Sequence, residues 1–149
     1  MLTLAIVNGP NLNLLGTREP HIYGLQPFDD YLAQLQERFP QARLHYYQSN
    51  VEGELINYLQ ACRTSTDGII LNAGGYTHTS IALADTIAAI GIPVIEVHIS
   101  NVLAREDYRK TSYIAARCIG SISGLGLDGY GLAVQYFAEQ VATTKTQSH

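Results

Sequence analysis

A carboxylate and an imidazole stand two residues apart in the run IPVIEVHISN, at Glu96 and His98. If this run is a strand, both side chains point to the same side of the sheet, and Ser100 follows them. A carboxylate beside a histidine fixes the ring tautomer and supports the imidazolium, which a general acid requires. A polar strip on an edge strand is the alternative interpretation. The apolar residues before Glu96 indicate an interior strand and favour catalysis.

A second polar segment, NGPNLNLLGTREPHIYG, occupies residues 8–24 and follows the first apolar run. With Asn11, Arg18 and Tyr23 it holds more polar groups than a turn needs, and its glycines and turn formers are typical of a mobile lid. Lowering a phenol pKa from about 10 to near neutrality takes roughly 3 to 4 kcal/mol. One arginine within about 4 Å supplies about 4 kcal/mol at an effective dielectric constant near 20. Tyr23 could therefore act as a tyrosinate base.

A third polar segment, NAGGYTHTS, covers residues 72–80. His78 in this segment precedes a helical pattern, where Thr77, Thr79 and Ser80 compete as N-caps. The sequence leaves two interpretations open for His78, a residue of the helix start or a donor to a ligand hydroxyl.

Two arginines, Arg105 and Arg109, lie one predicted helical turn apart, next to Lys110. A solvated helix face is the ordinary interpretation of such charges. Because they follow the HISN segment, recognition of an anion or a hydroxyl is an equal alternative.

Asp85 has apolar neighbours at the positions three and four residues away on both sides, namely Ile81, Ala82, Ala88 and Ala89. Such a patch is ordinarily buried, and a buried charge is costly unless it is paired. We therefore expect Asp85 either to reach solvent at the edge of the patch or to form a salt bridge across a subunit contact.

Alternating strand-like and helical segments position these residues. Strand patterns cover residues 2–7, 43–48, 68–71, 93–98 and about 119–123, and helical patterns cover 27–39, 52–63, 79–90 and 130–142, with a polar helical stretch at 104–109. Such alternation predicts a single domain over residues 1–149, with a frayed tail at 143–149. The predicted architecture is a flavodoxin-like three-layer α/β fold, with a five-stranded parallel sheet in the order 2-1-3-4-5 and helices on both faces.

In this fold, ligands bind beyond the carboxyl ends of the strands, where the strand order reverses. The segments NGPN, NAGGYTHTS and HISN each follow one of the central predicted strands. We therefore expect them to converge on one shared site.

Residues 124–129, GLGLDG, match the glycine pattern of dinucleotide-binding folds. In those folds the motif opens the first βα unit and an acidic residue follows about 20 positions later, after a second strand. Here only one helix follows. The motif is interpreted as a glycine-rich turn that lets a strand and a helix pack closely.

Composition narrows the function classes. The chain is 46% hydrophobic and 15% charged, which predicts a folded core and self-association. Its net charge of −4 does not suggest a polyanionic partner. The basic residues form no stripe and no long apolar run occurs, so neither a nucleic-acid nor a membrane partner is expected. Cys62 and Cys118 lack metal or disulfide spacing and are interpreted as reduced core thiols. The apolar N-terminal run is too short for a signal peptide, which predicts a cytoplasmic protein.

The chain resembles the type II 3-dehydroquinate dehydratases through four blocks, residues 8–24, 48–56, 70–85 and 92–109. The resemblance implies anti elimination of water from 3-dehydroquinate in the shikimate pathway, on the route to chorismate and aromatic amino acids. The product is 3-dehydroshikimate, formed through an enolate with no metal or organic cofactor. Ala115 and Ala116 stand where this family usually has Ser-Pro, so a difference is expected in packing or assembly rather than in chemistry.

The resemblance also implies a role for each site residue. Tyr23 removes a proton alpha to the ketone, with activation by Arg18 and support from Arg105. Asn11 stabilises the enolate through an ordered water, and His98, oriented by Glu96, protonates the departing hydroxyl. Asn72, His78 and Arg109 hold substrate hydroxyls, the backbone amides of Ile99 and Ser100 take the carboxylate, and Asp85 reaches a neighbouring subunit's site. The implied assembly is a dodecamer built from trimers.

Other functions fit the residues less well. A nucleotide-binding module of flavodoxin type needs backbone donors in its first loop, but Pro10 lacks one and Leu12, Leu14 and Leu15 crowd that segment. A phosphoacceptor domain would want an aspartate where Asn72 stands. A Schiff-base dehydratase would need a buried lysine, and only Lys110 and Lys145 occur.

Overall fold

The computed structural model describes residues 1–17 and 26–147. Five parallel strands form one sheet in the order β2-β1-β3-β4-β5, which confirms the predicted order. The strands are β1 (Leu2–Asn8), β2 (Ala42–Gln48), β3 (Gly68–Asn72), β4 (Val94–His98) and β5 (Gly120–Ser123). β1, β3 and β4 are interior strands, so their carboxyl ends meet in the middle of one edge of the sheet.

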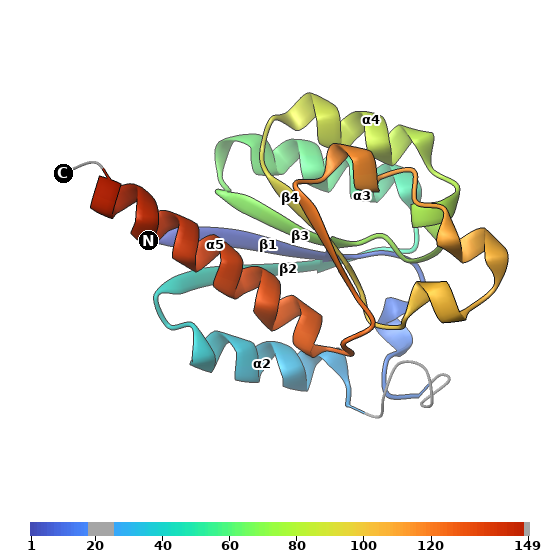
Figure 1. The fold of residues 1–149 in the computed structure, drawn as a ribbon, viewed down its shortest axis with the longest axis horizontal. Coiled ribbons are helices and arrows are strands. Elements are labelled where there is room, and N and C mark those ends of the chain that lie inside the picture. Colours follow the sequence, from blue (N-terminus) through green and yellow to red (C-terminus); the bar gives the residue numbers. More distant parts are fainter. Residues whose placement is uncertain (18–25, 148–149) are drawn as a thin grey trace.

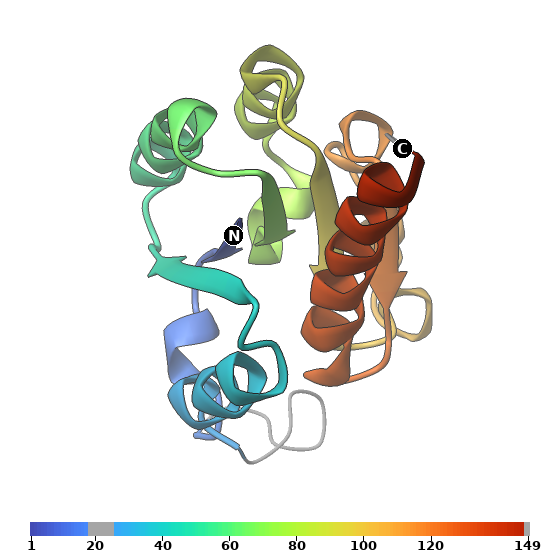
Figure 2. The same cartoon turned by 90° about the vertical axis from the view of Figure 1, so that its left-hand side faces the viewer.

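Helices cover both faces of the sheet, α2 (Phe28–Arg38) and α5 (Asp128–Gln147) on one face and α3 (Glu52–Ala61) and α4 (Ile81–Ile90) on the other (Figure 1 and Figure 2). Alternate residues of β1 serve the two layers. Leu4 and Ile6 pack with α2 and α5, whereas Ala5 and Val7 pack with α3 and α4. The predicted flavodoxin-like, three-layer fold is confirmed. Within the described residues, no helix is long and apolar enough to cross a membrane.

The predicted helical stretch at 104–109 is wrong. That region forms two short 3-10 turns, Val102–Ala104 and Asp107–Lys110, with Arg105 between them in an extended conformation. A short polar stretch has no apolar stripe to pack on the core, and an α-helix this short needs such packing. The two turns instead bring Arg105 and Arg109 to the edge of the sheet where the strands end.

The predicted end of the last helix is also wrong. α5 begins at Asp128 and continues to Gln147, so residues 143–147, predicted to be frayed, are helical. No glycine or proline interrupts the sequence there, and an established helix gains one hydrogen bond with each residue added.

The GLGLDG segment forms the expected turn between β5 and α5. Gly124 and Gly126 have φ angles of +87° and +61°, which favour glycine. A Cβ atom at Gly129 would lie 3.2 Å from Val97 Cγ1, so the absence of a side chain lets α5 lie close to β4.

Candidate active site

One pocket opens beyond the carboxyl ends of β1, β3 and β4, where the three polar segments meet. Eight of the residues singled out from the sequence line it: Asn11, Asn72, His78, His98, Ile99, Ser100, Arg105 and Arg109. The pocket is also lined by residues that are not predicted to bind or react: Pro10, Leu12, Gly74, Gly75 and Val102. Backbone and apolar surface therefore complete a pocket whose polar groups the sequence had indicated.

Glu96 and His98 form a buried hydrogen-bonded pair on β4, through Glu96 Oε1 and His98 Nε2. Since β4 pairs with β3 and β5, the alternative of a polar strip on an edge strand is excluded. Nδ1 is then the ring nitrogen of His98 left for exchange of a proton with a ligand. Glu96 Oε2 accepts hydrogen bonds from Ser112 Oγ at 3.1 Å and Ser121 Oγ at 3.5 Å. Both carboxylate oxygens are thus held in place.

His78 ends a 3-10 turn, Gly74–His78, that precedes α4. Ser80 is the N-cap of α4, and its hydroxyl accepts the Leu83 N–H at 3.0 Å, so His78 does not cap the helix. His78 Nδ1 lies 2.7 Å from the Thr111 carbonyl oxygen. Because a carbonyl only accepts, Nδ1 donates. His78 Nε2 can then accept from a ligand hydroxyl when the ring is neutral, and donate when it is charged.

The two imidazoles lie near each other in the pocket. The ring centroids of His78 and His98 are 6.3 Å apart, and the ring planes differ by 23°. His78 is fixed by a backbone carbonyl and His98 by a carboxylate. Because Glu96 orients the imidazole through Nε2 and leaves Nδ1 for a ligand, His98 is the candidate acid of the two.

Arg105 and Arg109 line the pocket from the two 3-10 turns that follow β4. Arg109 Nε donates to Glu106 Oε2 at 2.7 Å, Arg105 Nε lies 3.8 Å from the same oxygen, and Arg105 Nη1 donates to Ser100 Oγ at 3.3 Å. A hydrogen bond from its own backbone and then the one from Arg109 lower the pKa of Glu106. Burial alone would lower the pKa of Arg109, but the hydrogen bond to Glu106 keeps this pKa above its usual value.

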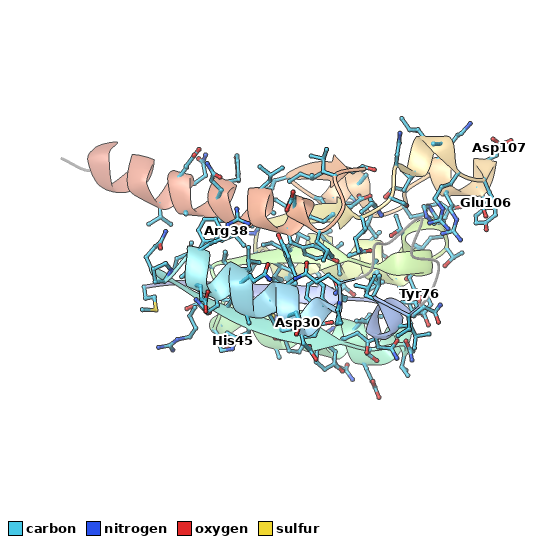
Figure 3. The ribbon with its side chains drawn as sticks, turned by 90° about the horizontal axis from the view of Figure 1, so that it is seen from below. Asp30, Arg38, His45, Tyr76, Glu106 and Asp107 are labelled. Atoms are coloured by element: carbon cyan, nitrogen blue, oxygen red, sulfur yellow. The ribbon has the colours of Figure 1, made fainter. Side chains whose placement is uncertain are left out.

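The charges at the pocket favour an anion. Two guanidinium groups line it, and no carboxylate does so among the residues the structure describes. Glu106 is exposed beside them and offsets one positive charge. In Figure 3, Glu106 and its neighbour Asp107 lie toward the same end of the molecule as Tyr76, far from Arg38 and His45. Among the described residues, the two guanidinium groups that line the pocket are suited to a ligand carboxylate.

Asn11 lines the pocket and is hydrogen-bonded to Asn50, a residue that the sequence did not indicate. Its φ angle is +70°, a left-handed conformation that asparagine tolerates better than most residues. Its backbone N–H donates to Asn50 Oδ1 at 3.0 Å, and Tyr76 Oη donates to the Asn50 carbonyl oxygen at 2.8 Å. Glycine at position 9 lets the loop after β1 lie against the loop after β3, because a Cβ atom there would lie 2.3 Å from the Ala73 oxygen.

Asp85 lies on the solvent side of α4 and is not part of the pocket. Its apolar neighbours Ile81, Ala82, Ala88 and Ala89 are exposed too, so this patch is not covered within the single chain. α4 covers the sheet with its opposite face, which contains Leu83, Ile87 and Ile90. An apolar helix packed on one face leaves its second apolar face for another contact.

Arg18 and Tyr23 lie outside the described residues. Within the described residues, no three His, Cys, Asp or Glu side chains gather as a metal site would require.

Comparisons with known proteins agree with one another. The model of the family "Dehydroquinase class II" matches residues 2–138. A 3-dehydroquinate dehydratase of Fusobacterium nucleatum is 50% identical over 144 residues, covering 93% of this chain and 97% of that protein. A catabolic 3-dehydroquinase of Aspergillus oryzae is 48% identical over 138 residues, covering 91% and 90%. The crystal structure of a type II dehydroquinase from Butyrivibrio crossotus matches with a TM-score of 0.88 at 41% identity, covering 91% and 96%.

Proposed function

This chain belongs to the class II dehydroquinase family, and on that premise we propose that it is a 3-dehydroquinate dehydratase, a hydro-lyase of the shikimate pathway. The observation that carries the proposal is the pocket beyond β1, β3 and β4. Its wall combines a paired histidine, a second histidine, two arginines and two asparagines. We further propose that the reaction is an anti elimination of water from 3-dehydroquinate, through an enolate, to give 3-dehydroshikimate.

The first proposed step removes a proton alpha to the substrate ketone. Tyr23 takes this proton as a tyrosinate, with Arg18 lowering the pKa of its phenol and Arg105 supporting the charge. Electrons of the broken C–H bond form the enolate. Asn11 stabilises the enolate oxygen through an ordered water, and the hydrogen bond from its backbone N–H to Asn50 Oδ1 supports this placement.

The second proposed step expels the hydroxyl beta to the ketone. His98 donates a proton to this hydroxyl, which leaves as water while the enolate electrons form the new double bond. Glu96 keeps the imidazole oriented through Nε2, so Nδ1 is the nitrogen that donates the proton. The base and the acid are different residues, as an anti elimination requires when it acts on opposite faces of the ring.

The remaining pocket residues bind the substrate. Arg109, His78 and Asn72 hold its hydroxyls, and the backbone amides of Ile99 and Ser100 take its carboxylate. The two guanidinium groups that line the pocket support this arrangement, because the substrate carries one carboxylate.

The proposed assembly is a dodecamer built from trimers, in which Asp85 of one subunit reaches the site of its neighbour. The exposed apolar face of α4 around Asp85 supports this proposal, because such a face is stabilised when a second subunit covers it. A cytoplasmic location stays a prediction, consistent with two free cysteines.

An absorbance assay tests the activity. The purified protein, treated with a chelator, should convert 3-dehydroquinate into a product with the ultraviolet absorbance of a conjugated enone. Borohydride added with substrate should not inactivate it, because neither Lys110 nor Lys145 is assigned a covalent role. Lys110 is half exposed and paired with Asp107 at 3.1 Å. No absorbance change would contradict the assigned activity, and inactivation by borohydride would contradict the enolate route.

A further inference from the structure

A chain of hydrogen bonds lies directly beneath the pocket. Asn8 and Asn72 end β1 and β3 and stand opposite each other in the sheet. The hydroxyl of Tyr130, in the first turn of α5, lies between them, 2.7 Å from Asn8 Oδ1 and 3.0 Å from Asn72 Nδ2. Asn8 Nδ2 lies 3.3 Å from Tyr46 Oη on β2. Asn8 and Tyr130 are fully buried, and Asn72 is 4% exposed where it meets the pocket.

One donor, the Gly74 N–H, sets the direction of each hydrogen bond in this series. The Gly74 N–H can only donate and lies 3.1 Å from Asn72 Oδ1, so the other end of the amide, Nδ2, faces Tyr130. Tyr130 therefore accepts from Asn72 and donates its own proton to Asn8 Oδ1. Burial raises the pKa of Tyr130 far above its usual value, so this phenol keeps its proton.

The Asn72 amide group carries two hydrogens, and Tyr130 occupies one of them. We propose that Tyr130 is a positioning residue, whose hydroxyl fixes the amide plane of Asn72 so that the second Nδ2 hydrogen is presented to a substrate hydroxyl. This inference rests on the proposed function, which assigns substrate hydroxyls to Asn72. The ring of Tyr130 packs edge-on against Phe28 at 4.9 Å, which holds it in place independently of its hydroxyl.

Tyr31 offers a matched control for Tyr130. It is buried in the same aromatic cluster, with ring centroids 6.4 Å apart, and its hydroxyl accepts a hydrogen bond from the Gly131 N–H at 3.2 Å. Tyr31→Phe removes a buried phenol hydroxyl from the same core, and the hydrogen bond that it removes is with the Gly131 N–H, not with the side-chain amide of Asn8 or Asn72. Any effect common to the two variants reports on the core, and any effect specific to Tyr130→Phe reports on Asn8 and Asn72.

Steady-state kinetics with 3-dehydroquinate test the proposal, with each tyrosine variant made in the wild-type and the Asn72→Ala backgrounds. Loss of one oriented hydrogen bond to the substrate should raise KM about three- to tenfold in Tyr130→Phe, with kcat within about twofold of the wild type. Tyr31→Phe should keep the wild-type KM. In the Asn72→Ala background, adding Tyr130→Phe should change KM by less than about twofold, because the amide it orients is gone.

Two results would overturn the proposal: equal KM values for Tyr130→Phe and Tyr31→Phe, or the same rise in KM with and without the Asn72 amide. If Tyr130→Phe does not fold, Asn8→Ala replaces it, since it leaves both rings in place and removes the acceptor that directs the Tyr130 proton. The same Asn72-dependent rise in KM is then expected, and an unchanged KM overturns the proposal. A wild-type protein that does not turn over 3-dehydroquinate would instead contradict the proposed function itself.

Discussion

At the scale of single residues, the proposed chemistry depends on which ring nitrogen each histidine has available. His98 Nε2 is bound to Glu96 and His78 Nδ1 to the Thr111 carbonyl, so each ring offers its other nitrogen to the pocket. The sequence indicated the first pair, because alternation along a strand places Glu96 and His98 on one side. It did not indicate Thr111, which lies 33 residues from His78 and meets it only through folding.

Ser112 tests whether catalysis depends on the hydrogen bonds that fix the Glu96 carboxylate. Its Oγ atom lies 3.1 Å from Glu96 Oε2, and that of Ser121 lies 3.5 Å away. Ser112→Ala should lower kcat about three- to tenfold, since a typical hydrogen bond contributes roughly 0.5 to 1.5 kcal/mol. Ser121→Ala, which loses the longer contact, should have the smaller effect. Equal rates for Ser112→Ala and wild type would show that this serine does not support the pair.

At the scale of elements, the fold was predictable and some element bounds were not. Alternating apolar runs and helical periods defined the sheet and its order, because each strand and helix buries a recognisable face. The segment at 104–109 has no such face, and its conformation depends on Glu106 and Ser100 gathering the arginines. Asn50 and Tyr130 were missed because their contacts join segments that are distant in the sequence.

The exposed face of α4, which includes Asp85 and Ile81, is predicted to contact a second subunit. If Asp85 bridges subunits, Asp85→Ala should reduce both the mass measured by light scattering and the turnover. Ile81→Lys, at a side chain 62% exposed in the single chain, should dissociate the assembly without unfolding the subunit. Glu37→Ala, an exposed acid on α2, serves as the control and should change neither. Unchanged mass and turnover in Asp85→Ala would show that Asp85 is a solvent-exposed residue of α4 and does not bridge subunits.

At the scale of the whole molecule, stability should fall in alkaline solution. Burial, and secondarily the charge of Glu96, raise the pKa of Cys118 from its usual value of 9.0 to about 12. Burial also raises the pKa values of Cys62, Tyr31, Tyr46 and Tyr58. The folded chain therefore keeps protons that the unfolded chain releases, so this stabilisation is complete below about pH 9 and is lost as the pH rises toward 12.

Denaturant titrations at pH 8 and pH 10.5 measure this loss. The free energy of unfolding should be lower at pH 10.5, and Cys118→Ala should reduce the difference between the two values because one shifted group is gone. Equal unfolding free energies at the two pH values would contradict the assigned pKa directions.

The central claim is that this pocket forms an enolate first and expels the hydroxyl second, with separate groups for the two steps. Proton NMR of 3-dehydroquinate in D2O measures both steps at once, as exchange of the alpha hydrogen and as appearance of 3-dehydroshikimate. His98→Ala should exchange the alpha hydrogen while forming product at a small fraction of the wild-type rate, because the base remains and the acid is missing. Tyr23→Phe should lose exchange and product together. If His98→Ala loses exchange as completely as product, or forms product at the wild-type rate, His98 is not the acid of the second step.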